Sequence, residues 1–182
     1  MAYRAAGAIA FAEQLVGRGR YGDGECWTLV EDAVVGAGGQ SSRTLTRNFG
    51  IHSNYVWGRP VIAANAAPGD VLQFRGYSWT RSITRSSGPS TSALGPAITD
   101  CEPSQGRSHH SAIIVRVIRA GLVEVIEQNI PRGTIPRRTI LAIIGGAQPP
   151  EDTVTNDMMG TYVTRRVTLD TVANPPSIYR PI

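Results

Sequence analysis

The chain has 182 residues, and because a typical domain has roughly 150 residues the length predicts a single domain. Hydrophobic residues make up 41% of the chain and charged residues 18%, which is typical of a folded protein and argues against disorder. No run reaches the roughly 18 apolar residues that a membrane helix needs, so we expect no membrane span. Two cysteines are too few for a disulfide scaffold.

The net charge is +4, and all 18 basic residues are arginine. Codon bias explains the absence of lysine, and the alternative is a basic face for an anionic partner such as a cell-wall polymer or an acidic peptide. The sequence contains neither a basic run nor a nucleic-acid-binding signature, so we expect no nucleic acid partner.

The chain begins with a segment that shares two features with a signal peptide, namely Arg4 and an A-x-A pattern at residues 10–12. The apolar stretch is short, however, and it continues into residues with helical spacing. We therefore interpret residues 4–16 as the first helix of the domain. The localisation stays unassigned, and delivery by phage lysis or by a non-Sec secretion route is a hypothesis that follows from the lack of a clear leader.

Periodicity and turn residues predict an α+β domain in which two helices precede a mostly antiparallel sheet. The helices are expected at residues 4–16 and 25–35, with a glycine-rich loop at 17–24 between them. A Pro-Gly-Asp turn at 68–70 precedes the first strand, and the polar residues 76–108 are expected to form a long loop. The predicted strands are 71–74, 112–118, 122–129, 137–144, 162–169 and 177–180, with a linker at 148–152.

Cys26 is predicted to lie in the first turn of the second helix, directly after the glycine-rich loop. A helix N-terminus carries about half a positive charge, which favours the thiolate and raises the reactive fraction of the sulfur. Glycines such as Gly24 allow a substrate backbone to approach closely. The alternative is a buried structural cysteine, which position alone does not exclude.

Two further segments carry polar groups that suit a cysteine nucleophile. His110 begins an apolar strand, and Glu127 and Asn129 share one face of the next strand by period 2. If Ala120 and Gly121 form the turn, paired residue numbers sum to 241, and a slip of two residues places His110 opposite Asn129. Either register predicts that His110, Glu127 and Asn129 share a face, where an imidazole would compensate a buried carboxylate.

Together these residues match the nucleophile, base and orienting group of papain-like catalysis. Histidines and cysteines could also bind a metal, but Cys26, Cys101, His109 and His110 form no compact ligand motif. We therefore expect neither a metal nor another cofactor.

The same segments resemble a known family. The sequence contains, in order, FAEQLVG, YGDGECWTLVEDAV, PGDVLQF, HSAIIVRV, VEVIEQN and IYRP. This order is similar to that of the CHAP domains, the cysteine, histidine-dependent amidohydrolases/peptidases, which are relatives of the NlpC-type cell-wall peptidases. The resemblance covers nearly the whole chain.

The resemblance implies a papain-like fold and a cysteine-dependent hydrolase of peptidoglycan amide bonds, either an N-acetylmuramoyl-L-alanine amidase or an endopeptidase. Cys26 would be the nucleophile and His110 the base, with Glu127 as the expected orienting group and Asn129 in support. The alternatives are a protease or deamidase toxin that acts on a host protein, and an inactive binding domain of the same fold.

Residues near the nucleophile are candidates for substrate binding, namely Tyr21, Gly24, Trp27 and His109, although Trp27 also suits a place in the core. Peptidoglycan or a peptide is the expected substrate, and an immunity or inhibitor protein is a further candidate partner. We expect the chain to be a monomer.

Overall fold

The computed structural model describes residues 2–89, 98–102, 106–144, 152–156 and 161–182. The helices in this part of the chain are α1 (Ala5–Leu15), α2 (Cys26–Gly36), the short α3 (Ser42–Leu45) and a 3-10 turn at Ala63–Asn65. The strands are β1 (Arg59–Val61), β2 (Val71–Pro89), β3 (Ile98–Glu102), β4 (Arg107–Arg119), β5 (Leu122–Glu127), β6 (Arg137–Ala142), β7 (Asp152–Asn156), β8 (Thr161–Ala173) and β9 (Ser177–Arg180).

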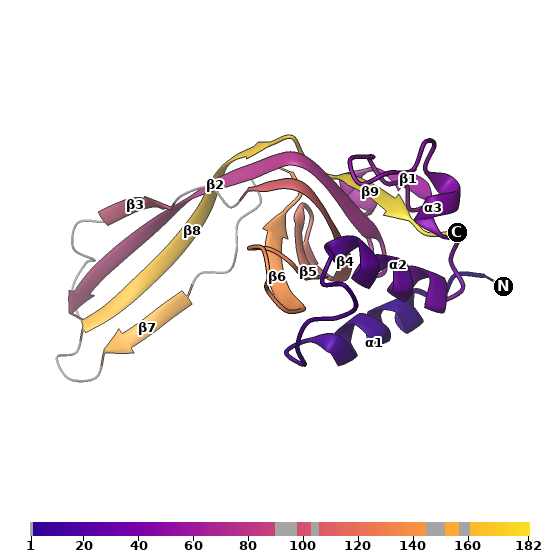
Figure 1. Ribbon diagram of the computed structural model, residues 1–182. Coiled ribbons are helices and arrows are strands. Elements are labelled where there is room, and N and C mark those ends of the chain that lie inside the picture. The colour runs from indigo at the N-terminus through magenta and orange to yellow at the C-terminus, as the bar shows by residue number, and fades with distance from the viewer. Residues whose placement is uncertain (1, 90–97, 103–105, 145–151, 157–160) are drawn as a thin grey trace.

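The helices and the sheet form separate layers, with the helices gathered at one end of the molecule (Figure 1). The body of the sheet has the strand order β1-β9-β2-β4-β5-β6, and β3, β7 and β8 extend it around β2. All pairings among the described strands are antiparallel. The predicted α+β class with an antiparallel sheet is therefore confirmed.

The sheet is apolar on both faces, because successive side chains of a strand point to opposite sides. On β4, Ile113 packs in the cluster that includes the helices, whereas Ala112 and Ile114 pack in the cluster on the other face. On β5, Ile126 packs in the cluster with the helices and Val125 packs in the cluster on the other face. The central strands β4 and β5 are thus buried on both sides, which holds them firmly in place.

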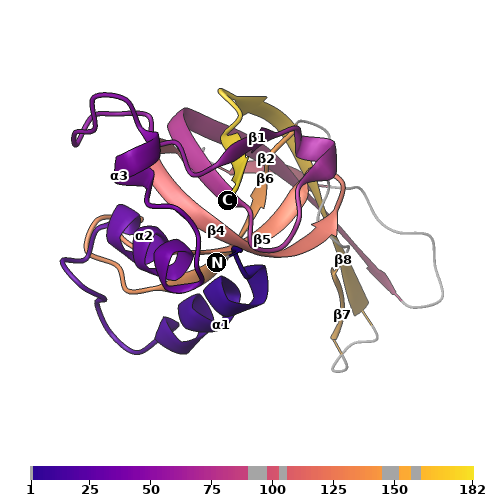
Figure 2. The ribbon, with the colours of Figure 1, turned by 90° about the vertical axis from the view of Figure 1, so that its right-hand side faces the viewer.

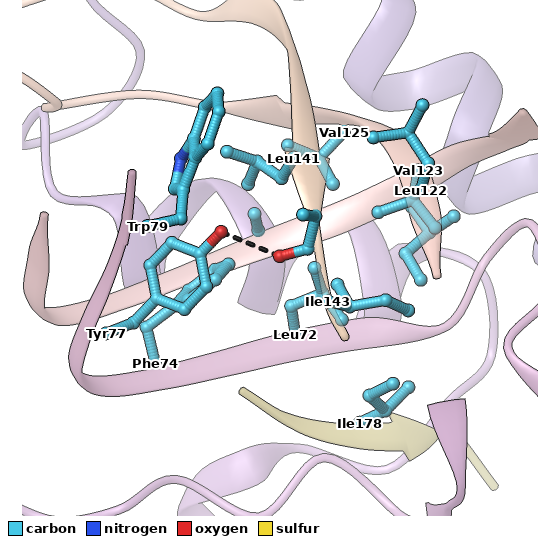
Figure 3. Packing of buried hydrophobic residues seen from close by; sticks show 13 residues of the cluster. Leu72, Phe74, Tyr77, Trp79, Leu122, Val123, Val125, Leu141, Ile143 and Ile178 are labelled. Atoms are coloured by element: carbon cyan, nitrogen blue, oxygen red, sulfur yellow. Dashed lines mark hydrogen bonds between the residues drawn. The ribbon is translucent and has the colours of Figure 1, made fainter. Parts of the chain in front are cut away.

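The cluster on the face away from the helices lies inside a curled sheet (Figure 3). Tyr77 from β2 donates a hydrogen bond of 2.7 Å to the carbonyl oxygen of Ala142 on β6, although β4 and β5 separate these strands in the sheet. The curl brings the two distant strands together around a packed interior of aliphatic and aromatic side chains.

The prediction of a long loop at residues 76–108 is wrong for the part of this segment that the structure describes, and residues 90–97 and 103–105 lie outside the described residues. Strand β2 continues for 19 residues to Pro89 and pairs with β8 over most of its length, while β3 pairs with the other edge of β2. Figure 1 shows these strands and β7 as an arm that extends away from the helices. The segment has few apolar residues, so its periodicity gave no strand signal, whereas backbone pairing with the distant β8 stabilises the strand.

The strands that carry the candidate site also differ in register from the simplest prediction. Arg119 pairs with Leu122, as the sum of 241 requires, but irregularities in β4 change the sum to 239 at the Ile113–Ile126 pair. The register next to the site is therefore the slipped one. Strand β5 ends at Glu127, two residues earlier than predicted.

The predicted linker at 148–152 lies mostly outside the described residues, and its last residue, Asp152, begins β7. No helix within the described ranges is long and apolar enough to cross a membrane.

Candidate active site

Cys26 is the first residue of α2, and the preceding loop is hydrogen-bonded to Gln128, the residue that follows strand β5. The buried side chain of Gln128 donates to the carbonyl oxygens of Tyr21 (3.1 Å) and Glu25 (2.8 Å) and accepts a hydrogen bond from the Tyr21 amide (3.2 Å). Asp23 accepts a hydrogen bond from the Glu25 amide at 2.9 Å. These bonds set the position at which the helix begins and hence the position of the half-buried sulfur.

His110 lies on β4, the strand against which α2 packs (Figure 2). Its Nε2 atom is 3.0 Å from Oε2 of Glu127 on the neighbouring strand. The Cys26 side chain lies close enough to the same imidazole to raise its pKa. Because an ionised carboxylate only accepts hydrogen bonds, Nε2 carries the proton toward Glu127, which leaves Nδ1 for the sulfur.

Glu127 has a second cationic partner, Arg107, at the start of β4. The guanidinium donates through Nε at 2.9 Å and through Nη2 at 2.7 Å to the two carboxylate oxygens. Both side chains are at least 98% buried. A bidentate pair of this kind fixes the plane of the carboxylate as well as its charge. Arg107, Glu127 and His110 thus form a buried series of groups, and the half-buried Cys26 lies next to its last member, His110.

The charges of this series change the pKa values of its members. Burial lowers the pKa of His110, but the hydrogen bonds and charges of Cys26 and Glu127 outweigh burial and raise it to about 9. Burial raises the pKa of Glu127, but the hydrogen bonds and charges of His110 and Arg107 outweigh that effect and lower it to about 2. At neutral pH the imidazole is therefore protonated and the carboxylate ionised.

The hydrogen bonds of the Asn129 side chain go to Glu25 and to the Gly133 amide. Asn129 follows the end of β5 with a φ of 67°, a conformation that turns the chain out of the strand. Its amide nitrogen donates to the Glu25 carboxylate at 3.0 Å, and its side-chain oxygen accepts from the Gly133 amide at 2.7 Å. Asn129 thus braces the loop before Cys26, and Glu127 is the group that contacts the imidazole.

A cleft with a volume of about 520 Å³ opens at Cys26. Trp27 and His109, two of the candidate binding residues, line it together with Asp23, Glu25, Arg43, Phe49, Gly50, Ile51 and Tyr55. The aromatic rings form one continuous cluster, in which Phe49 stacks on Tyr55 and both contact Trp27.

The other two candidate binding residues have structural contacts. Tyr21 packs edge-on against Phe11 and donates to the Asp32 carboxylate at 2.8 Å. Gly24 is buried in the turn before α2 and has a φ of 86°, so glycine is needed there for the backbone conformation.

Sequence reasoning missed Arg107, Gln128, Arg43 and Tyr55. Arg107 falls in the segment that was expected to be a loop, so no face could be assigned to it. Gln128 follows Glu127 directly, and by period-2 alternation it shares a face of the strand with the apolar Ile126. This shared face was the one available signal that Gln128 is buried. The aromatic residues of the 40–66 segment were visible in the sequence, but nothing in their spacing connects them with Cys26.

Comparisons of the chain with protein-family models, with curated proteins and with solved structures find no match. Within the described ranges, no group of three or more histidine, cysteine, aspartate and glutamate side chains is arranged to hold a metal ion.

Proposed function

We propose that the protein is a papain-like cysteine hydrolase that cleaves amide bonds of peptidoglycan. The observation that carries the proposal is the position of His110, which lies between a cysteine at a helix N-terminus and a buried, ionised glutamate. This arrangement supplies a nucleophile, a base beside it and an orienting group that is hydrogen-bonded to the base, and the nucleophile lines a cleft.

The proposed reaction begins with Cys26 as a thiolate paired with the protonated imidazole of His110. The sulfur attacks the amide carbonyl carbon, and the new C–S bond gives a tetrahedral oxyanion. The C–N bond then breaks as His110 donates its proton to the leaving amine. Water attacks the resulting thioester while His110 takes its proton, and the C–S bond breaks to release the carboxylic acid and restore the thiolate–imidazolium pair.

The oxyanion needs hydrogen-bond donors that are already in place. The first amide groups of α2, including that of Cys26, have no acceptor within the helix and lie beside the nucleophile. We assign the Cys26 amide as one such donor. Glu127 accepts the Nε2 proton of His110 and so orients the imidazole with Nδ1 toward the sulfur. Arg107 keeps Glu127 ionised and fixes the orientation of its carboxylate.

The choice of peptidoglycan rests on the similarity of the six sequence segments to CHAP domains. Three structural features agree with that similarity: the cysteine begins a helix, the histidine lies on the second long strand, and the Pro-Gly-Asp turn at 68–70 leads into β2. The side chain of Asp70 in this turn is buried and pairs with Arg180 of the terminal IYRP segment at 2.9 Å.

The direct test is digestion of purified peptidoglycan, with the products identified by mass spectrometry. We expect the wild-type chain to release muropeptides with a new free amine and a new carboxyl group, and Cys26→Ala to release none. Cys101→Ser is the matched control, since it removes the other thiol of the chain and should retain full activity. The mass of the new ends distinguishes an amidase from an endopeptidase.

Absence of muropeptides from the wild-type digest contradicts the peptidoglycan assignment. If Cys26 is then labelled by a thiol probe in the wild type but not in His110→Ala, the relay acts on another amide, as in a protease or deamidase toxin. If Cys26 is not labelled at any pH, the chain is an inactive binding domain and the hydrolase proposal fails.

A further inference from the structure

The cleft beside Cys26 contains a cation that the proposed reaction does not use. The guanidinium of Arg43 lies 4.4 Å from the centre of the Trp27 ring and 4.8 Å from that of Phe49. Contact with two aromatic faces holds the planar group in one orientation while its N–H donors, which lie in the plane, stay available. Among the residues that the structure describes, no carboxylate forms an ion pair with Arg43.

The acidic residues of the same cleft are already engaged. The Asp23 carboxylate accepts a hydrogen bond from the Glu25 amide, and the Glu25 carboxylate accepts one from the Asn129 side chain. His109 is uncharged at neutral pH, because burial lowers its pKa and its contact with the Ser53 carbonyl only partly opposes that effect. Among the described residues that line the cleft, Arg43 is therefore the positively charged side chain without an acidic partner.

Tyr55 lines the same cleft as Cys26 and Arg43. Burial raises the pKa of the Tyr55 hydroxyl, the charge of Cys26 raises it further, and the charge of Arg43 lowers it. The same hydroxyl thus experiences both the sulfur and the guanidinium. The apolar rings around it, together with Ile51 at the rim, form a wall of low polarity that strengthens a charge contact.

We propose that Arg43 is a specificity-determining residue that binds a free carboxylate of the substrate next to the amide bond that Cys26 attacks. The substrate class is then an acidic peptide rather than its amidated counterpart. Asp23 and Glu25 repel a carboxylate from the loop side of the cleft, so the charge pattern also orients the substrate. The inference rests on the proposed function, since it assigns the substrate class of the same site.

Two small alkylating reagents test the charge preference without peptidoglycan. Iodoacetate carries a carboxylate and iodoacetamide does not, while the reacting carbon is the same. We expect Arg43→Gln to lower the iodoacetate-to-iodoacetamide rate ratio at Cys26 on the order of fivefold, the size of an exposed charge contact. Arg43→Lys should retain part of the ratio, because it keeps the charge but not the planar group. Mass spectrometry of the Cys26 peptide gives each rate.

The matched control is Arg47→Gln, which removes the same charge from an exposed residue four positions along the chain that does not line the cleft. It should leave the ratio unchanged. An equal ratio in the wild type and Arg43→Gln overturns the proposal. An equal loss in Arg47→Gln also overturns it, because the effect would then come from the overall charge of the protein.

A binding measurement decides the question if Cys26 is unreactive and the proposed function fails. Titration with N-acetylglycine should shift the NMR signal of the Trp27 indole N–H, whose ring lies under the guanidinium, and N-acetylglycinamide should not. The shift should be lost in Arg43→Gln. Equal shifts with both compounds, or none with either, contradict a carboxylate site at Arg43.

Discussion

The two sides of His110 differ sharply. Behind the imidazole, Glu127 and Arg107 are buried and joined by two hydrogen bonds of 2.9 and 2.7 Å. In front of it, Cys26 is half-buried and opens onto a cleft lined by aromatic rings and charges of both signs. The buried side sets the charge and orientation of the imidazole, whereas the open side meets the substrate. Substitutions behind His110 should therefore change protonation and stability, and substitutions in front should change selectivity.

The largest effect is expected for Glu127→Gln. The amide cannot compensate the charges of His110 and Arg107, so kcat/KM should fall by about 10²- to 10⁴-fold and the free energy of unfolding by about 3 kcal/mol. We expect the alkaline limb of the wild-type pH–rate profile near pH 9, and Glu127→Gln should move it to lower pH, because Glu127 raises the pKa of His110. Rates measured from pH 5 to 10 check this shift.

Glu124→Gln is the matched control on the same strand. Glu124 contacts Arg116 and Arg138, whose side chains are exposed, so its loss should cost less than about 1 kcal/mol. An alkaline limb that does not move in Glu127→Gln contradicts the role assigned to the buried carboxylate.

Arg107→Met is expected to have the next largest effect. Loss of one partner from a buried ion pair should lower the free energy of unfolding by about 3 kcal/mol. The pKa of Glu127 should rise, so activity should decline at a higher pH on the acid side than in the wild type. Arg107→Lys should restore part of the stability.

A double-mutant cycle sharpens this result. The variant that combines Arg107→Met with Glu127→Gln should lose less stability than the sum of the two single losses, because no charge is then left without its partner. Additive losses in urea unfolding would mean that the bidentate contact is not formed in solution.

The stability of the wild type should depend on pH through the same groups. The folded-state pKa of Glu127 is about 2 against an ordinary 4.5, so its contribution is present above pH 4.5 and is lost as the pH falls toward 2. The folded-state pKa of His110 is about 9 against 6.5, so its contribution is present below pH 6.5 and is lost as the pH rises through 9. Urea unfolding at each pH measures both slopes, and Glu127→Gln should flatten both.

The part of this site that depends on local sequence patterns could be predicted from the sequence. Helical spacing placed Cys26 at a helix start, and period-2 alternation placed His110 and Glu127 on neighbouring strands. The partner Arg107 was not predictable, because its strand is defined by pairing with the distant β2 rather than by its own residues. The position of Asn129 depends on a left-handed backbone conformation after β5, which alternation along a strand does not reveal.

The smallest effect is expected for Asn129→Ala, which tests whether Asn129, and not Glu127, orients the imidazole. The positive φ should make alanine cost roughly 1 kcal/mol of stability, and Asn129→Gly should remove most of that strain. Because Asn129 contacts Glu25 and Gly133, kcat/KM should change by only a few-fold and the pH–rate profile should keep its limbs. A shifted alkaline limb would show that Asn129 orients the imidazole.

The rate at which iodoacetamide alkylates Cys26 at pH 6 tests the central claim, that His110 activates this sulfur. If the thiolate–imidazolium pair forms, the wild type should react at least about tenfold faster than His110→Ala, in which the cysteine loses its cationic partner. Equal rates in the two proteins, measured on the Cys26 peptide by mass spectrometry, would contradict the account.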